Sequence, residues 1–285
     1  MKRWLGAVGL AVLLVPGFAA AQGINTNVAL AVAQGEGIFR SQLRVLQAHD
    51  DPQGLGREVD AWVAPQTVIY GVTPRLTAFA TLQVLARRRV EAPDGRVRRD
   101  AAVGDFQLLG RYTVFADDYA PLSTRRVALL AGVKFPTGAE RFGTPSVDPI
   151  LGGVATWAAN RHELDLDALF TITTRRHGFE AGDVFRYDLA YRYRLWPGRF
   201  GRRLQQLNGV LDLNGRWQGR THRGGRSISA SGGNTLYLSP GLQFIVKDYI
   251  VEASFQVPVW QDRNGPQLEE DYVAVLSVRI PFEPF

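Results

Sequence analysis

Hydrophobic and polar residues alternate with a period of two through most of the chain after residue 100. The stretch from Phe185 to Leu195 shows this most clearly, because every second residue is large and apolar and those between are charged except for Ala190. Segments 163–172, 251–259 and 272–282 repeat the pattern. Successive side chains of a strand point to opposite faces, so each segment predicts a strand with one apolar and one polar face.

The same pattern, combined with turn residues, predicts twelve strands along the chain. Their ranges are 38–48, 59–70, 76–86, 103–115, 125–135, 147–158, 163–174, 184–195, 207–219, 234–245, 249–259 and 270–282. Several have the length of about 9–11 residues that a tilted strand needs to cross a bilayer. Strands of a soluble sandwich are usually shorter, about 5–6 residues.

The gaps between the predicted strands are unequal in a regular way. Most gaps after even-numbered strands are short, as at 71–75, 159–162 and 246–248. Gaps after odd-numbered strands are longer and polar or Gly-rich, as at 87–102, 136–146 and 220–233. The gaps 116–124 and 196–206 are long for the short-turn side. Outer-membrane barrels combine an even strand count with short turns on one side and long loops on the other.

We therefore predict an all-β fold, a transmembrane antiparallel up-and-down β-barrel of about 12 strands. A soluble exported β-sandwich is the alternative, because it also produces alternation. Aromatic residues near strand ends fit a bilayer, since Trp and Tyr gather at both interfaces of a membrane. Trp157, Trp196 and Tyr249 fall toward the short turns, and Trp260 falls toward the long loops.

The N-terminus carries the features of a secretory signal. Lys2 and Arg3 precede an apolar run, and Ala19 to Ala21 supply the small residues of a cleavage site. We predict a cleaved signal peptide at 1–21, a segment of unknown role at 22–37 and the barrel at 38–285. The expected location is the outer membrane of a Gram-negative cell. At the other end, Phe282 or Phe285 could mark the last strand for the outer-membrane assembly machinery.

Composition argues against several classes of chemistry. The chain has no Cys, which excludes disulfides, Cys-ligated metal and a Cys nucleophile. Its four His lack metal-ligand spacing and have no nucleophile at catalytic spacing. The net charge is +6, but the basic residues are scattered among acids, which argues against nucleic acid. We predict no enzymatic activity, no cofactor and no metal.

The polar strand face would line the lumen and supplies the candidate pathway residues. These are Asp105, Arg111, Asp167, Asp188, Arg192, Arg194 and Glu252. They could line a passage, or they could pair across the interior and brace a filled barrel. A second group of candidates falls in predicted long loops: Arg87, Arg88, Arg89, Arg220 and Arg223. These guanidiniums could bind the phosphates of lipopolysaccharide, or attract anionic solutes to the mouth.

Three short motifs in order carry a resemblance to a known family. They are Tyr70-Gly71-Val72-Thr73-Pro74-Arg75-Leu76, Gly104-Asp105 before a strand, and Pro136-Thr137-Gly138 after the segment 127–135. The chain resembles the outer-membrane transporter family named for the MetA pathway of phenol degradation. The resemblance implies a barrel that passes small, often aromatic or hydrophobic, molecules, and it supplies no catalytic residues. We therefore expect a channel for passive uptake or efflux of small molecules; the alternative is a non-conducting structural or adhesive barrel.

Overall fold

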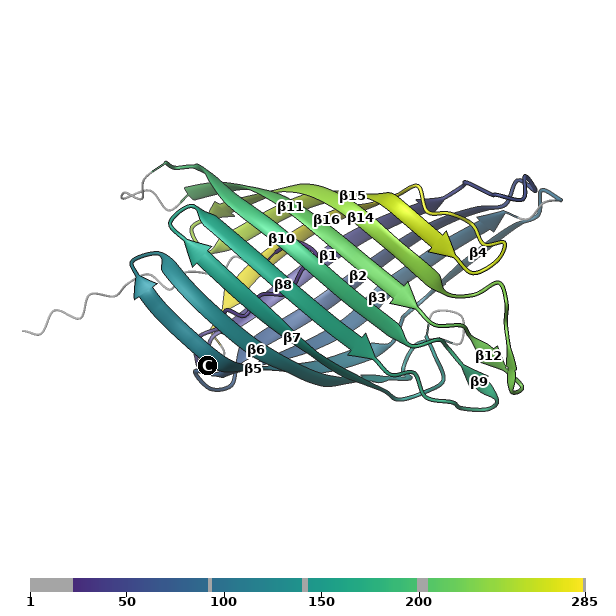
Figure 1. Cartoon of the computed structure of the whole chain (residues 1–285), viewed down its shortest axis with the longest axis horizontal. Helices are drawn as coiled ribbons and strands as arrows, with labels where there is room; N and C mark the ends of the chain where they lie inside the picture. The colour runs from purple at the N-terminus through teal and green to yellow at the C-terminus, as the bar shows by residue number, and fades with distance from the viewer. Residues whose placement is uncertain (1–22, 92–93, 140–142, 199–204, 284–285) are drawn as a thin grey trace, which may run out of the picture.

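The computed structural model describes residues 23–91, 94–139, 143–198 and 205–283. The predicted signal peptide, its cleavage site and Phe285 lie outside these ranges. Within them the chain is all β and contains no helix long and apolar enough to cross a membrane. Figure 1 shows long strands that run side by side at a tilt around a barrel.

Twelve strands form the wall of this barrel. They are β1 (Gly37–Ala48), β2 (Glu58–Gly71), β3 (Leu76–Glu91), β5 (Phe106–Ala120), β6 (Ser123–Phe135), β7 (Asp148–Ala159), β8 (His162–Thr171), β10 (Val184–Trp196), β11 (Gln205–Gln218), β14 (Gly233–Val246), β15 (Tyr249–Arg263) and β16 (Tyr272–Phe282). Each pairs antiparallel with its neighbours, and β1 pairs with both β2 and β16. The sheet is therefore closed, which satisfies the backbone groups that hydrocarbon could not.

The two ends of the barrel differ as the gap lengths predicted. One end, called here the short-turn end, carries connections such as 121–122, 160–161 and 247–248. The opposite, long-loop end carries 49–57, 136–147, 172–183, 219–232 and 264–271. Three two-residue strands, β9 (Phe179–Glu180), β12 (His222–Arg223) and β13 (Arg226–Ser227), form a small sheet beyond the wall at the long-loop end (Figure 1).

Two predicted connections are wrong in length. The predicted loop 87–102 is largely a hairpin, because β3 continues to Glu91 and pairs with β4 (Val97–Ala102). The predicted gap 116–124 shrinks to the two residues between β5 and β6. In both places the strand continues through charged residues beyond its alternating apolar residues. The predicted strands ended too early because the alternation stops where a strand leaves the membrane.

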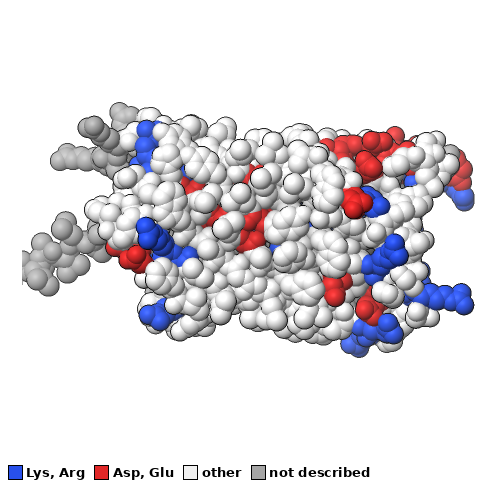
Figure 2. Space-filling view, in the orientation of Figure 1, with Lys and Arg blue, Asp and Glu red and all other residues white. Residues whose placement is uncertain are grey.

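Side chains alternate between lumen and membrane face as the pattern predicted. In β10, Leu189 is 36% exposed and Ala190 is 1% exposed. Figure 2 shows charged side chains gathered toward both ends of the barrel, with a mostly white middle in which only a few charged atoms, chiefly acidic, are visible. On β15, Tyr249 and Trp260 are exposed near opposite ends of the strand. This is the arrangement of two interfacial aromatic girdles around an apolar band of about 25 Å.

Candidate functional site

The N-terminal residues 23–36 lie inside the barrel. Ile24, Val28, Ala29 and Val32 are at most 4% exposed, although they belong to no strand. Their hydrogen bonds reach β16 and β1 at one end of the segment and β3 and β2 at the other. Between these ends it bonds to β11, β8 and β7, so the segment loops around the inside of the wall and its two ends lie against neighbouring strands.

Arginines on the wall bind the carbonyl oxygens of this segment. Arg279 donates to Gly23 O at 3.1 Å, Arg40 to Ile24 O at 2.6 Å, and Arg111 to Val28 O at 2.6 Å and to Leu30 O. A buried carbonyl outside a sheet or helix needs such a partner. The guanidinium presents five donors in a fixed fork, so one side chain can serve two carbonyls, as Arg111 does.

Acidic and hydroxyl side chains bind the amide groups of the same segment. The backbone N–H groups of Asn25, Asn27, Ala29 and Val32 donate to Asp212 (3.2 Å), Asp167 (3.4 Å), Thr156 (2.8 Å) and Thr77 (3.2 Å), respectively. The Asn side chains add to this, since Asn27 Nδ2 donates to Asp167 at 2.7 Å and Asn25 Nδ2 to Ser254 at 3.0 Å. The lumen thus offers donors and acceptors in the order that the backbone requires.

Apolar packing and two close approaches complete the fit. Ile24 packs with Val210, Tyr237, Val273 and Val275, and Ala29 and Val32 pack with a larger cluster that includes Phe79, Leu109, Leu130 and Leu169. A Cβ on Gly71 would lie 2.0 Å from the carbonyl oxygen of Ala33. A Cβ on Gly241 would lie 2.6 Å from Cδ1 of Ile24. Glycine at both positions leaves the space that the segment occupies.

A polar network braces the wall near the short-turn end. Arg192 pairs with Glu163 and donates to Gln243 at 3.2 Å, and Gln243 donates to Glu252 at 2.8 Å. Glu252 also pairs with Arg279 at 2.8 Å and with Arg40 at 3.4 Å. The network links β8, β10, β14, β15, β16 and β1, and its last two arginines hold the N-terminal segment.

The seven predicted pathway residues therefore fall into groups rather than one ring. Arg111 and Asp167 bind the segment directly. Asp188 accepts from Asn214 at 3.0 Å, which in turn donates to Thr26 at 3.4 Å. Arg192 and Glu252 belong to the polar network of the wall. Arg194 lies near the short-turn end, where its backbone exchanges hydrogen bonds with Arg161.

Asp105 holds a loop at the long-loop end. Its carboxylate accepts from the backbone N–H groups of Gly138 and Thr144, both at 2.9 Å, and pairs with Lys134 at 3.3 Å. Thr137 Oγ1 accepts from the backbone N–H of Phe106 at 2.8 Å. The motifs Gly104-Asp105 and Pro136-Thr137-Gly138 are thus two sides of one contact, which folds the loop 136–147 against the start of β5.

The predicted loop arginines lie in three different settings. Arg87, Arg88 and Arg89 are on β3, with Arg87 paired in register with the exposed Trp62. Arg89 pairs with Asp60 at 3.4 Å and Glu91 at 2.5 Å, and Arg88 lies opposite Asp100. Arg220 is in the loop after β11, and Arg223 is on β12, 5.7 Å above the ring of Phe179.

The sequence interpretation left the role of the segment 22–37 open and did not place it in the site. Its residues Ile-Asn-Thr-Asn-Val-Ala-Leu-Ala-Val-Ala (24–33) show no strand alternation. The usable signal is the combination of small apolar side chains with two Asn shortly after the predicted cleavage site. Within the described residues no group of three or more His, Asp or Glu is arranged to hold a metal ion.

Comparisons with known proteins agree with this architecture. The COG4313 outer membrane channel from Pseudomonas putida F1 superposes with a TM-score of 0.68 at 15% identity, over 89% of this chain and 98% of that one. The β domain of the Bordetella autotransporter BrkA superposes with a TM-score of 0.52 at 11% identity, over 87% and 99%. At these identities the likeness shows the fold. A search among curated proteins found no match.

A family model covers most of the barrel, from residue 58 in β2 to residue 263 in β15. The matched region includes the Tyr70–Leu76 turn and the contact between Asp105 and the Pro136-Thr137-Gly138 loop. The chain belongs to the family described as "Putative MetA-pathway of phenol degradation".

Proposed function

We propose that the protein is an outer-membrane channel for passive passage of small molecules, and that residues 23–36 close its lumen. The observation that carries this proposal is the way the segment is held. It contributes no strand to the sheet, and wall side chains bind its backbone. The segment can therefore leave while the wall keeps its inter-strand ladder. The superposition with an outer membrane channel supports the same function.

The size of the barrel supports conduction once the segment leaves. Eight-stranded barrels are filled by their own side chains, and barrels of about 16–18 strands hold an aqueous channel. A wall of twelve strands lies between these cases. Here the interior is filled by wall side chains together with a strap of fourteen residues, 23–36. Removal of the strap empties the middle of the lumen without removing a wall strand.

Small aromatic or apolar molecules are the solutes we propose. The family description names phenol degradation. The lumen also offers an apolar cluster around Phe79, Leu109 and Leu130, in addition to its polar network. Ala29 and Val32 cover this cluster in the structure. A solute with an apolar ring could take their place. Passive transport, with no catalytic step, is part of this proposal.

Conductance in planar bilayers tests the proposal. A variant that lacks residues 23–34 retains all wall strands and should conduct continuously, whereas the full chain should show brief or small openings. Migration on gels before and after boiling shows whether each variant has folded. A folded deletion variant with no conductance and no solute flux would overturn the channel and favour the structural barrel. The double variant Asn25→Ala with Asn27→Ala weakens the binding of the segment without deleting it. Its conductance should lie between those of the full chain and the deletion variant.

We also propose a lipid contact for the outer arginines and an assembly role for the last strand. Arg87 lies beside Trp62, which has the exposure of an interfacial Trp, so its guanidinium can reach lipopolysaccharide phosphate. Arg220 and Arg223 extend beyond the wall and are the second candidate group. Phe282 is exposed at the end of β16 and is available to the assembly machinery.

A further inference from the structure

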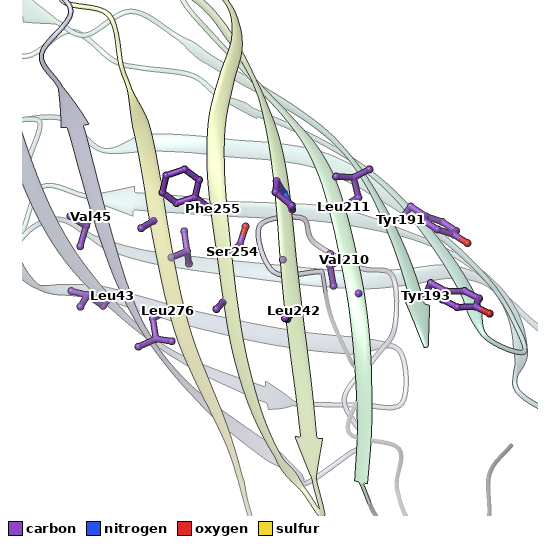
Figure 3. A pocket seen from close by; sticks show the side chains of 16 residues that line it. Leu43, Val45, Tyr191, Tyr193, Val210, Leu211, Leu242, Ser254, Phe255 and Leu276 are labelled. Atoms are coloured by element: carbon purple, nitrogen blue, oxygen red, sulfur yellow. The ribbon is translucent and has the colours of Figure 1, made fainter. Parts of the chain in front are cut away.

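The apolar patch on the membrane face offers a solute no charged group. It is formed by side chains such as Leu242 on β14 and Phe255 on β15 (Figure 3), and the described residues that line it include no Asp, Glu, Lys or Arg. The lumen differs, because its wall carries buried arginines behind the N-terminal segment. A solute with a charged group would therefore be bound in the lumen and not on the membrane face.

Arg111 is unlike Arg40 and Arg279, which also bind the segment, because it has no carboxylate partner. Arg40 and Arg279 share Glu252, at 3.4 and 2.8 Å. Arg111 forms no ion pair with any residue that the structure describes, and its Nε has no hydrogen-bond partner among them. Asp167 acts on it only from beyond ion-pair distance. The charge of Arg111 is therefore balanced mainly by the carbonyl groups of the segment.

Opening of the lumen would remove this balance. When residues 28–32 leave, the guanidinium loses both carbonyl oxygens and keeps the hydroxyl of Thr77, 3.5 Å from Nη2. Its other surroundings are the ring of Phe79, 5.0 Å away, and the apolar cluster to which that ring belongs. An unpaired charge in such surroundings is costly. An anion that binds there offsets the cost, and it therefore favours the open state.

The segment itself shows which kind of anion fits. Arg111 Nη1 donates to Val28 O at 2.6 Å and Nη2 donates to Leu30 O, so each terminal nitrogen holds one oxygen. The two oxygens of one carboxylate can take these places, because the guanidinium fork matches a carboxylate in geometry. Next to the fork, Ala29 and Val32 fill apolar space within the cluster. The body of the ligand would lie in that space.

We propose that Arg111 and the apolar cluster around Phe79 form a binding site for a small aromatic carboxylate, which takes the place of residues 28–32. This inference rests on the proposed channel function and names the charged group of its solutes. A dry cavity of about 150 Å³ holds one benzene ring, and the five residues fill a larger space. A rigid ring loses less conformational freedom on binding than a flexible chain, and it can pack against Phe79 in offset or edge-to-face geometry.

A cavity of about 710 Å³ at the short-turn end gives the displaced segment room to move. Ala31, Val32 and Ala33 line one side of it, and the turn residues Pro74 and Asp248 line other sides. The segment can shift into this cavity without displacing a wall strand. The solute and the displaced segment therefore need not compete for the same space once the site has opened.

Binding to the deletion variant that lacks residues 23–34 tests the site directly, because its wall strands are complete. Benzoate, benzamide and hexanoate are compared by equilibrium dialysis. We expect benzoate to bind about tenfold more tightly than benzamide, which has the ring without the charge, and more tightly than hexanoate, which has the charge without the ring. Arg111→Met in the same variant should bind benzoate no better than benzamide. Arg216→Met, on β11, is the matched control and should keep the full affinity for benzoate.

A single thiol tests displacement of the segment in the full chain, which has no native Cys. Ala29 is 0% exposed, so Ala29→Cys should react slowly with a water-soluble maleimide. Saturating benzoate should raise the labelling rate about threefold or more, because binding of the solute favours the displaced segment, and benzamide should leave the rate unchanged. When Arg111→Met is added, benzoate should no longer affect the rate. Migration on gels before and after boiling confirms that each variant is folded.

The outcomes separate the binding site from the channel. Equal affinity for benzoate and benzamide, or full affinity after Arg111→Met, would overturn the site, and hexanoate that binds as tightly as benzoate would overturn the assignment to aromatic acids. If the deletion variant does not fold, thiol labelling of folded Ala29→Cys that is indifferent to benzoate would overturn the proposal. Conductance of the deletion variant is measured without any aromatic acid. The channel function therefore survives failure of the site, and benzoate binding without conductance would remove the channel and keep the site.

Discussion

Arg111 donates a hydrogen bond of 2.6 Å to the backbone carbonyl oxygen of Val28, a residue 83 positions earlier in the chain. The same guanidinium donates to Leu30 O and lies 5.0 Å above the ring of Phe79. Arg111 is only 1% exposed, so its charge is compensated by carbonyl dipoles and an aromatic face rather than by water. The side chain and the N-terminal segment therefore depend on each other inside the barrel.

Replacement of Arg111 should loosen the segment. In Arg111→Met the carbonyls of Val28 and Leu30 lose their donors, and hydrogen bonds from a charged group contribute about 1.5–3 kcal/mol each. We expect longer channel openings in planar bilayers and faster proteolysis within residues 23–36. Arg216→Met is the matched control, because Arg216 lies on β11 and donates to Gln218 rather than to the segment. Equal gating in the two variants would contradict the role of Arg111.

Gly71 should be required for closure of the lumen by the N-terminal segment but not for folding of the barrel wall. In Gly71→Ala the new Cβ would meet the carbonyl oxygen of Ala33 at 2.0 Å, a distance that backbone atoms cannot tolerate. The segment must then shift at its β2 end, and we expect raised conductance with normal heat-modifiable migration. Gly153→Ala is the control, since its nearest neighbour would be 3.8 Å away. An unfolded Gly71→Ala protein would mean that the contact supports the wall itself.

The wall could be predicted from the sequence because the membrane imposes a strict two-residue period. For β10 the predicted range 184–195 and the observed range Val184–Trp196 differ by one residue. Pro65, which interrupts β2 in the sequence, sits at a register shift in the structure, where a missing N–H is tolerated. Local pattern was sufficient wherever one face met lipid.

The site could be predicted only in part because its contacts are formed by closure of the barrel. The polar face indicated Arg111 and Asp167 as lumen residues, but nothing local links them to Val28 and Asn27. Those contacts connect positions more than 80 residues apart, and they exist only once β1 has paired with β16. A short segment without alternation carries no periodic signal that could place it inside the barrel.

Signal cleavage remains a prediction that mass spectrometry can check. Cleavage after Ala21 gives a mature chain that begins Gln-Gly-Ile-Asn. Ile24, which lies against Gly241, and Asn25, which binds Asp212, then follow the new terminus almost directly. The intact mass of protein purified from membranes should equal residues 22–285, with or without loss of ammonia from the terminal Gln. A mass that includes residues 4–15 would contradict the prediction.

Lipopolysaccharide should stabilise the protein through Arg87. Arg87 is exposed beside Trp62, whereas its neighbour Arg89 already pairs with Asp60 and Glu91. We expect added lipopolysaccharide to raise the Tm of the wild type, and Arg87→Ser to lose a clear part of that increase. Arg89→Ser should lower the Tm with and without lipid, because it breaks pairs within the protein. A lipid-dependent increase that is identical in wild type and Arg87→Ser would exclude this contact.

Arginine placed on the membrane face should be far more harmful than arginine placed one residue further along the same strand. Leu189 is directed to lipid, and Leu189→Arg should destabilise the barrel by about 2–4 kcal/mol if the site lies near the bilayer midplane. Ala190 is directed inward and is paired in register with Asp165 on β8 and Asp212 on β11. Ala190→Arg therefore adds a cation between two carboxylates, which offsets much of its burial, although it competes with Asn25 for Asp212. Urea unfolding in lipid vesicles measures the loss of stability in both variants. Comparable losses in the two variants, or recovery of the wild type in a soluble fraction, would contradict the assigned faces.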